Sequence, residues 1–461
     1  MLTRLRLRNF KAWVDTGDIR LAPLTIFFGA NSSGKSSINQ FLLMLRQTSE
    51  SPDRQRVFHT GDKKTAVDLG RYPDMVHRHT DEALIGFEIE WSLPSEMKLT
   101  DVLSDTEFSG SSVSFAAEAG LQGGRQDPTV RRMGYRLGDP SSTGLEVGME
   151  QQQGANGKYE LTHHRYKPVR NPGKPWPLPP PTRFYGFPDE VAAKYQNVSI
   201  VRDLTLELEK QLQRIYYLGP LREYPQRQYT WAGERPEHVG WRGERAIDAF
   251  LAARERRLSP GRKKRRYPFA VVTARWLKQM GLIESFEVKQ IATGRRDFEA
   301  LVKSTGGTAS ANLTDVGFGV SQVLPVLVEC FYATHGSTII MEQPEIHLHP
   351  SVQASLADLF IEAVHAWEGG RARGIQLLIE SHSEHFLRRL QRGIAEEAID
   401  RDSVAIYVCR STPSGSRIDP LDVDLYGNIT NWPDNFFGDE VEDLRAMTEA
   451  AARRQPAGQQ P

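Results

Sequence analysis

Apolar and basic residues alternate over the first eight positions, which is the pattern of a strand with one buried face. A second short strand is expected at 19–21. Residues 24–28 form a continuous apolar or β-branched run and predict a third strand, buried on both faces. Apolar positions then recur at helical spacing from 38 to 45, so a helix is expected to follow this strand.

The second half of the chain alternates apolar runs with amphipathic stretches. After a helix at 201–213, strands are expected at 215–218, 337–341, 375–380 and 404–409, with helices at 320–332, 351–367 and 386–392. Strands that alternate with helices predict a largely parallel, helix-covered sheet. Residues 50–200 differ, because they are rich in Gly, Ser and Pro and contain only short β-like runs.

Composition narrows the class of protein. The chain has 461 residues, of which 39% are hydrophobic and 25% charged, as in soluble globular proteins. No apolar run approaches the roughly 20 residues of a membrane span, and the alternating N-terminus is not a signal peptide, so no membrane partner is expected. Cys330 and Cys409 form neither a metal motif nor a disulfide framework, which favours a cytoplasmic location.

A phosphate-binding loop is indicated between the third strand and the helix. Residues 29–36 read Gly-Ala-Asn-Ser-Ser-Gly-Lys-Ser and match the pattern GxxxxGK(S/T). The glycines allow successive backbone N–H groups to point at phosphate oxygens, and the N-terminus of the helix favours anions. The buried strand before the loop and the amphipathic helix after it exclude a chance match. The chain is therefore predicted to bind ATP, or a closely related nucleotide, with Mg²⁺.

Two side chains of this loop have distinct expected roles. Lys35 is expected to contact the β- and γ-phosphates, and the hydroxyl of Ser36 to ligate Mg²⁺. The whole set of candidate nucleotide-binding residues in the loop is Gly29, Asn31, Ser32, Gly34, Lys35, Ser36 and Ser37.

The metal needs a carboxylate at the end of another buried strand. Glu342 follows the apolar run at 337–341 and is predicted to be that ligand. His347 and His349 lie nearby, but their spacing does not suit one helix face, so we expect them to shape a turn and not to bind zinc. His382 follows the next strand and is a candidate contact to the γ-phosphate or to the attacking water.

Four motifs occur in an order that resembles the ABC-type ATPase heads shared by SMC-like, RecF-like and overcoming-lysogenization-defect (OLD) ATPases. They lie at 29–37, 313–322, 339–350 and 379–386. More narrowly, three segments resemble a bacterial subfamily of predicted ATPases that is often associated with defence against phage; these segments are 217–224, 342–345 and 427–437.

The resemblance implies an α/β fold and a division of the chain. The expected fold is a P-loop NTPase head with a mostly parallel, helix-covered sheet, an N-terminal antiparallel β subdomain, a β-rich insertion and no long coiled coil. The expected parts are the N-terminal head at 1–48, a β-rich part with the insertion at 49–200, a linking helical lobe at 201–310, the C-terminal head at 311–440 and a flexible tail at 441–461.

The resemblance also implies that two heads assemble head to tail with ATP between them. Each nucleotide would meet the phosphate loop of one subunit and a signature segment of the other. Here Gly317 and Gly319 open an apolar helix in that segment, another site suited to anions. Gly317 stands where related heads carry a phosphate-contacting serine, so backbone N–H groups would have to make the contact. The alternative is a simple helix cap.

Related heads follow the metal-side carboxylate with a glutamate that polarises water. This chain has Gln343, which can orient water but cannot accept a proton. Either Glu345 serves as the base, or hydrolysis is slow and the site works as a nucleotide-held clamp. We predict slow ATPase activity, because Lys35, Ser36 and His382 are all present.

The strongest charge cluster is an expected loop that consists of Arg262, Lys263, Lys264, Arg265 and Arg266. It can bind nucleic-acid phosphates, although a solvated loop or a protein-docking patch fits equally well. The leading hypothesis is a homodimer or higher homo-oligomer that senses a trigger or controls a separate effector, a nuclease or a toxin, in antiphage defence. The alternatives are an ATPase for DNA repair or maintenance that clamps nucleic acid, and a non-hydrolysing, ATP-dependent scaffold.

Overall fold

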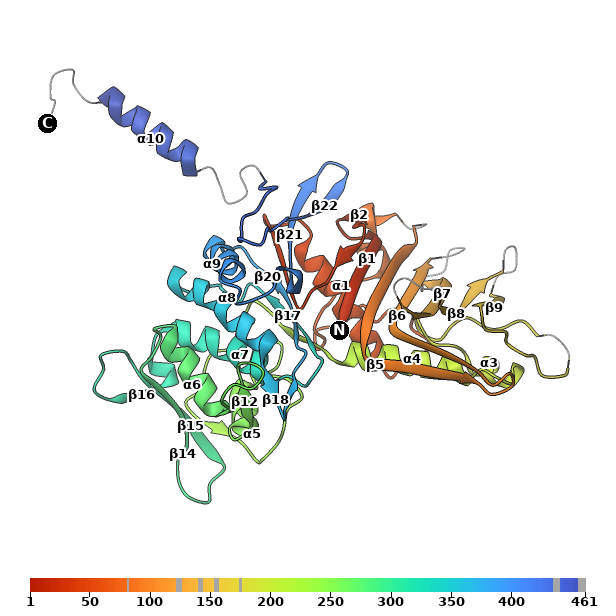
Figure 1. Cartoon of the computed structure of the whole chain (residues 1–461), viewed down its shortest axis with the longest axis horizontal. Coiled ribbons are helices and arrows are strands. Elements are labelled where there is room, and N and C mark those ends of the chain that lie inside the picture. Colours follow the sequence, from red (N-terminus) through yellow and green to blue (C-terminus); the bar gives the residue numbers. More distant parts are fainter. Residues whose placement is uncertain are drawn as a thin grey trace.

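The computed structural model describes residues 1–80, 83–121, 127–139, 144–152, 157–173, 176–433 and 440–454. Its body contains a mostly parallel sheet and a large antiparallel sheet, with the helix α1 (Lys35–Glu50) packed between them (Figure 1). None of the helices in the described part of the chain has both the length and the hydropathy of a membrane span.

The parallel sheet carries the ends of the strands on which the predicted site depends. Its first five strands are parallel and its last strand is antiparallel to the fifth. In spatial order they are β10 (Ile215–Leu218), β17 (Thr338–Glu342), β20 (Gln376–Glu380), β4 (Leu24–Gly29), β21 (Val404–Thr412) and β22 (Gly415–Pro420). The strands predicted from apolar runs are confirmed, and β20 lies between β4 and β17.

Alternate side chains of the parallel sheet enter two separate cores. Ile26 and Phe28 face one core, whereas Phe27, between them, faces the other. The first core contains α7 (Phe318–Tyr332), α8 (Pro350–His365) and α9 (Glu384–Ala395), and the second contains α1. The sheet is therefore covered by helices on both faces, as its apolar runs predict.

The antiparallel sheet joins the N-terminal strands to the region predicted as an insertion. Residues 85–164 do not form a separate unit, because β5 pairs directly with β1 and the remaining strands follow in sequence order. The strands of the sheet, within the described residues, are β1 (Leu2–Phe10), β2 (Trp13–Asp15), β3 (Ile19–Arg20), β5 (Ile85–Asp101), β6 (Thr106–Gly120), β7 (Thr129–Gly138), β8 (Leu145–Gln151) and β9 (Tyr159–His164).

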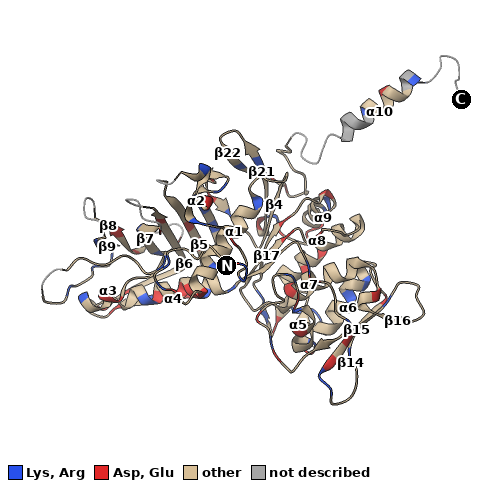
Figure 2. Cartoon of the chain, turned by 180° about the vertical axis from the view of Figure 1, so that it is seen from behind, with Lys and Arg blue, Asp and Glu red and all other residues tan. Residues whose placement is uncertain are grey.

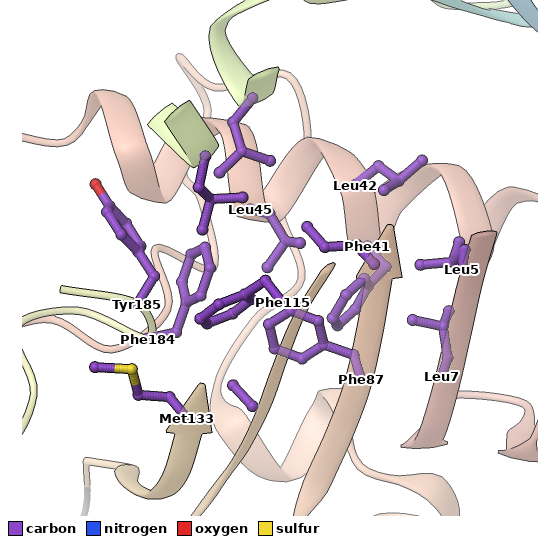
Figure 3. Packing of buried hydrophobic residues seen from close by; sticks show 14 of the residues in the cluster. Leu5, Leu7, Phe41, Leu42, Leu45, Phe87, Phe115, Met133, Phe184 and Tyr185 are labelled. Atoms are coloured by element: carbon purple, nitrogen blue, oxygen red, sulfur yellow. The ribbon is translucent and has the colours of Figure 1, made fainter. Parts of the chain in front are cut away.

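Aromatic packing holds α1 against this sheet. Phe41 of α1 packs edge-on against Phe87 of β5, with ring centroids 4.9 Å apart. Phe115 and Phe184 extend the same cluster, as Figure 3 shows. The helix α4 (Ser199–Gln213), expected in the linking lobe, also belongs to this core. The large sheet therefore braces the helix that begins at the phosphate loop.

Residues 229–312 contain more β-structure than the predicted helical lobe. Two helices, α5 (Ala246–Ala253) and α6 (Phe269–Gln279), lie beside a small sheet of β11 (Tyr229–Thr230), β14 (Ser285–Gln290), β15 (Asp297–Lys303) and β16 (Ser310–Asn312). A second small sheet consists of β12 (Arg257–Ser259), β13 (Tyr267–Pro268), β18 (Trp367–Glu368) and β19 (Arg371–Ala372). The predicted basic loop connects β12 and β13.

Short helices and the C-terminal helix complete the described chain. The short helices are α2 (Tyr72–Met75) and α3 (Asp189–Lys194). Where the sequence predicts a flexible tail at 441–461, α10 (Glu440–Arg454) is helical and stands away from the body (Figure 1). The tail from 455 onward lies outside the described residues, as do 434–437 of the subfamily segment.

One buried side chain ties the two large sheets together. The amide of Gln376 is fully buried, donates hydrogen bonds to the carbonyls of Leu2 and Ala22, and accepts from the Leu2 N–H and the Thr338 hydroxyl at 2.7–3.1 Å. We expect Gln376→Leu to lower the free energy of unfolding by about 2–4 kcal/mol, because it leaves several buried polar groups without partners. Chemical denaturation measures this, and Gln213→Leu, at an exposed position of α4, is the matched control. Equal stability of the two variants would contradict this role.

Candidate functional site

The phosphate loop joins β4 to α1 and has the backbone geometry that its glycines predict. Gly29 adopts φ 143°, and a Cβ atom there would lie 2.2 Å from the carbonyl oxygen of Cys409. Gly34, the residue before the helix, adopts φ 92°. No side chain of the described residues caps the first turn of α1, and no acidic residue lies in that turn. Its N–H groups therefore remain suited to an anion.

The other loop residues differ in what they offer a ligand. Asn31 and Ser32 are exposed, and Ser32 adopts φ 62°. Ser37 is buried, because its hydroxyl donates to the carbonyl of Gly34 at 2.6 Å and accepts from the indole N–H of Trp13 at 2.9 Å. Ser37 thus braces the loop from inside.

Lys35 and Ser36 lie against the end of β20. The Lys35 ammonium is 3% exposed and donates to the carbonyls of Gly29 and Ala30 at 3.0 and 2.8 Å. It also lies 3.8 Å from a carboxylate oxygen of Glu380, to which the Ser36 hydroxyl donates at 3.1 Å. Burial lowers the pKa of Lys35 from its ordinary value.

Three carboxylates are buried at the carboxyl ends of β17 and β20. Glu342 and Glu380 are direct neighbours in the parallel register, and Glu345 follows three residues after Glu342. Their exposures are 9%, 3% and 6%, respectively. Each has one buried oxygen without a hydrogen-bond partner among the described residues. Burial raises the pKa of all three, and for Glu342, where the charge of Glu380 adds to it, to about 7.

These oxygens fit a magnesium ion held together with a nucleotide. Mg²⁺ prefers oxygen ligands and is usually held by one or two carboxylates together with water and substrate phosphates. Ser36, Glu342 and Glu380 supply a hydroxyl and unpartnered carboxylate oxygens. Within the described residues no three His, Cys, Asp or Glu side chains form a metal site by themselves. This donor set therefore suits a metal that arrives with phosphates.

The residues predicted to act on water lie at the same strand ends. Gln343 adopts the left-handed conformation, φ 46°, and its N–H donates to the carbonyl of Glu380 at 2.8 Å. One oxygen of Glu345 accepts from the Ser381 hydroxyl and from the His382 N–H at 2.8 and 2.6 Å. Glu345 therefore joins the segment after β17 to the segment after β20.

His382 presents an exposed side chain at this edge. Its pKa lies below the ordinary value because of partial burial and the positive charge of Lys35. A neutral imidazole can accept a proton or a hydrogen bond. The structure thus brings His382 to the same edge of the sheet as the phosphate loop.

The two histidines after β17 form part of a turn, as the sequence predicts. His349 precedes α8, and its ring nitrogen accepts from the Ser351 N–H at 3.3 Å. His347 adopts φ 62° and packs against Phe318, with ring centroids 5.5 Å apart.

The predicted signature segment lies at the start of α7. Gly317 is exposed and precedes the helix, and a Cβ atom built on it meets nothing within 4 Å. Gly319 lies in the first turn. No hydrogen bond or ion pair between described residues joins this segment to the phosphate loop of the same chain.

Sequence reasoning missed part of the site. Glu380 was visible as a carboxylate at the end of a buried strand, but its contact with Ser36 depends on the strand order. Tyr217 of β10 is mostly buried, and burial together with the nearby Glu342 carboxylate raises its pKa well above the ordinary value. Arg222 was not missed, because the sequence indicates that it can reach the nucleotide or the partner head; the structure places it four residues after β10, buried near Glu342 and Glu345.

Glu342 is expected to make the nucleotide-free protein less stable at high pH. Its pKa rises from 4.5 to about 7 on folding. Between these values the unfolded chain has lost a proton that the folded chain retains, so stability falls as the pH rises to 7 and stays low above it. We expect Glu342→Gln to raise the free energy of unfolding by about 2–3 kcal/mol at pH 8 and to change it little at pH 4.

Thermal and chemical unfolding of both proteins at the two pH values measures this difference. Glu237→Gln, at an exposed position, is the control. An equal shift at both pH values would show that the effect of Glu342→Gln does not come from the ionisation of this carboxylate.

Two protein-family models match parts of the chain. The model described as AAA ATPase domain matches residues 262–387, which include the strand ends with Glu342 and Glu380. The model described as protein of unknown function (DUF3696) matches residues 399–447. Curated proteins give no match. The ATPase-domain match and the loop between β4 and α1 together support an ATP-binding ATPase.

Solved SMC head domains resemble the chain weakly. The SMC head domain from Thermotoga maritima has a TM-score of 0.40 and 11% identity, covering 92% of this chain and 99% of its own. The Smc head domain with an extended coiled coil, bound to the C-terminal domain of ScpA and derived from Pyrococcus furiosus, has a TM-score of 0.42 and 9% identity, covering 98% of this chain and 99% of its own. Likenesses at this level say nothing about partners.

Proposed function

We propose that this protein is an ABC-type ATPase that binds Mg·ATP at residues 29–36, hydrolyses it slowly and assembles head to tail with ATP at the interface. The observation that carries the proposal is the position of the phosphate loop. It opens an uncapped helix N-terminus directly beside a buried cluster of carboxylates with unpartnered oxygens. Buried carboxylate oxygens without partners are costly, and a cation that also coordinates phosphates would satisfy them.

Each loop group has a task in this proposal. Backbone N–H groups of the loop and of the first turn of α1 bind phosphate oxygens. Lys35 leaves the carbonyls of Gly29 and Ala30 for the β- and γ-phosphates, and Ser36 with Glu342 or Glu380 holds the metal. Mg²⁺ bound there would neutralise charge on the phosphate oxygens.

Slow hydrolysis follows from the groups that face the attacking water. Gln343 accepts no proton, and Glu345 is already held by Ser381 and His382 through one of its oxygens. The other oxygen of Glu345 has no hydrogen-bond partner among the described residues and is the candidate proton acceptor. Because most catalysis of phosphoryl transfer comes from positioning and electrostatics, turnover is expected to be slow but present.

An exposed apolar surface supports assembly on the face that carries the start of α7. Leu221 and Tyr224 are 68% and 74% exposed, and Phe318 is 42% exposed. Tyr224 and Phe318 pack against each other with ring centroids 5.8 Å apart. Exposed apolar groups that lie together mark interaction sites. We propose that this surface meets the phosphate-loop face of a second copy.

Molar mass tests the assembly directly. We expect Mg·ATP to convert the monomer into a dimer or a larger homo-oligomer. Tyr224→Ser should raise the protein concentration needed for half-maximal assembly by about tenfold, because the interface loses an aromatic side chain that it would bury. Light scattering after size exclusion measures the mass. Tyr426→Ser, at a site that is 78% exposed elsewhere on the chain, is the matched control. Mass independent of nucleotide would contradict the proposed assembly.

The proposed biological role is control of a separate effector, a nuclease or a toxin, in bacterial antiphage defence. The support for this role is the resemblance of residues 217–224 and 342–345 to ATPases associated with defence. The neighbouring genes test this role. A nuclease or toxin gene beside this one favours control of an effector in defence, whereas repair genes favour an ATPase for DNA repair or maintenance.

The second candidate function is a nucleic-acid clamp, favoured by the loop between β12 and β13. All five basic residues of 262–266 are exposed, and none forms an ion pair within the described chain. Elsewhere, Figure 2 shows both signs of charge spread over the body. Gel shifts over a range of salt concentrations separate the two functions. Charge reversal of 262–266 removes DNA binding only if the clamp is real, with Lys63 and Lys64 reversed as the control.

A third candidate is a scaffold that needs ATP but does not hydrolyse it, favoured by Gln343. Comparing the mass reached with ATP and with a non-hydrolysable analogue, alongside turnover, separates it from the ATPase. The scaffold predicts equal mass with both nucleotides and no phosphate release, whereas the ATPase predicts an assembly that decays with ATP and persists with the analogue.

A further inference from the structure

Arg222 is a buried cation with free hydrogen-bonding capacity. Its exposure is 8%, and its Nε and Nη1 atoms are buried without partners among the described residues. The acidic groups whose charges act on it are the phenol of Tyr217 and the carboxylates of Glu342 and Glu345. Arg222 forms no ion pair within the described chain. Neither carboxylate therefore has an oxygen within 4 Å of the guanidinium nitrogens.

The strand order places Arg222 and Lys35 on opposite sides of the carboxylates. Arg222 follows β10, the carboxylates end β17 and β20, and Lys35 follows β4, in the spatial order β10, β17, β20, β4. Lys35 and Arg222 are both more than nine-tenths buried. Two buried cations therefore flank the three carboxylates at the edge where the phosphate loop opens.

A structural role for Arg222 fits its surroundings poorly. Arg373 shows what such a role requires, because it is also fully buried and donates hydrogen bonds to the carbonyls of Cys330 and Ala333. Arg222 makes no hydrogen bond of this kind within the described chain. A buried guanidinium without partners is costly, so its free N–H groups call for an anion.

We propose that Arg222 binds the terminal phosphate of ATP from the side opposite Lys35. The inference rests on the proposed function and assigns a further residue to the same site. A planar guanidinium stays charged and donates several hydrogen bonds, which suits phosphate oxygens. Lys35 contacts both the β- and the γ-phosphate, whereas Arg222, beyond β17, contacts the γ-phosphate alone. Arg222 therefore distinguishes ATP from ADP.

Arg222 also acts in the hydrolytic step without exchanging a proton. A water oxygen forms a bond to the γ-phosphorus, and the bond from this phosphorus to the bridging oxygen of ADP breaks. The water loses one proton, which passes to a carboxylate and then to solvent, and the products are ADP and inorganic phosphate. Arg222 stabilises the charge on the transferred oxygens throughout, because its guanidinium remains protonated.

Equilibrium binding of Mg·ADP and of a non-hydrolysable Mg·ATP analogue tests the inference without turnover. We expect Arg222→Ala to weaken binding of the analogue by at least about tenfold and to leave ADP within about twofold, because one charge-assisted contact to the γ-phosphate is lost. Arg222→Lys keeps the charge, so its affinity for the analogue is expected to lie between those of Arg222→Ala and the wild type. Lys35→Ala is expected to weaken both nucleotides.

The outcomes separate this inference from the proposed function. If the wild type binds neither nucleotide, both are wrong. If the wild type binds both and Lys35→Ala binds neither, while Arg222→Ala keeps the wild-type ratio of affinities, only the inference is wrong. A parallel loss of both nucleotides in Arg222→Ala and Arg222→Lys, both with wild-type melting, would mean that Arg222 shapes the site and does not read the γ-phosphate. If Arg222→Ala does not fold, the ratio of the affinities for the analogue and for ADP is measured on Arg222→Lys and Arg222→Gln instead.

Discussion

Lys35→Ala is expected to weaken Mg·ATP binding by at least about a hundredfold and to reduce phosphate release to background, because the β- and γ-phosphates lose their charged contact. Within the described part of the chain, Lys35 donates hydrogen bonds to two carbonyls of its own loop and lies near Glu380. Its removal therefore affects the ligand more than the fold. Titration calorimetry and a steady-state phosphate assay at saturating Mg·ATP measure the two effects.

Lys64→Ala is the control for this variant, since Lys64 is exposed and lies away from the loop. Melting curves establish that both variants are folded. Wild-type turnover in a folded Lys35→Ala variant would mean that the measured activity comes from another site or from a contaminating enzyme.

Gly317→Glu is expected to abolish Mg·ATP-dependent assembly and to lower turnover at least about fiftyfold, while nucleotide binding to the single chain stays unchanged. The new carboxylate would face the phosphates of the nucleotide held by the partner, and like charges repel strongly in a desolvated interface. The monomer should tolerate the change, because Gly317 has φ −56° and a Cβ atom there meets nothing within 4 Å.

Thr308→Glu adds the same charge at another exposed position and serves as the control. Light scattering measures the assembly, and binding of a fluorescent ATP analogue at low protein concentration measures the single-chain site. Normal assembly of Gly317→Glu would place the interface elsewhere on the molecule.

Local sequence patterns predict the elements that form the site. The apolar runs at 24–28, 337–341 and 375–380 correspond to β4, β17 and β20, and the helical spacing after residue 35 corresponds to α1. Both signals can be read within one short segment. A strand buried on both faces has no polar positions, and an amphipathic helix repeats its apolar positions every turn. The same patterns also locate Glu342 at a strand end.

Long-range pairing is not encoded in such patterns. From their composition, residues 49–200 look like a β-rich part of the head with an insertion, but β5 of this region pairs with β1 and extends the N-terminal sheet. Similarly, the contact between Ser36 and Glu380 requires β20 to lie beside β4, which nothing near either residue specifies. Register and strand order depend on packing across the whole sheet.

Arg222 illustrates the same limit at a single residue. The sequence places Arg222 in a loop after a predicted strand, from which it can reach either the nucleotide or the partner head, and does not decide between the two. Its burial and its unpartnered N–H groups follow from the position of β10 at the edge of the parallel sheet, next to β17. The left-handed conformation of Gln343 likewise follows from the turn after β17.

Mixing two inactive variants tests the composite site most directly. Lys35→Ala has a defective phosphate loop and an intact start of α7. Gly317→Glu has an intact phosphate loop and a defective start of α7. An equal mixture with Mg·ATP should release phosphate far faster than either variant alone, at up to about half of the wild-type rate, because only the mixed dimer contains an intact site and it has one such site of two. If each variant alone is inactive and the mixture is inactive too, although mass measurements show mixed dimers, the nucleotide site is not shared between two subunits.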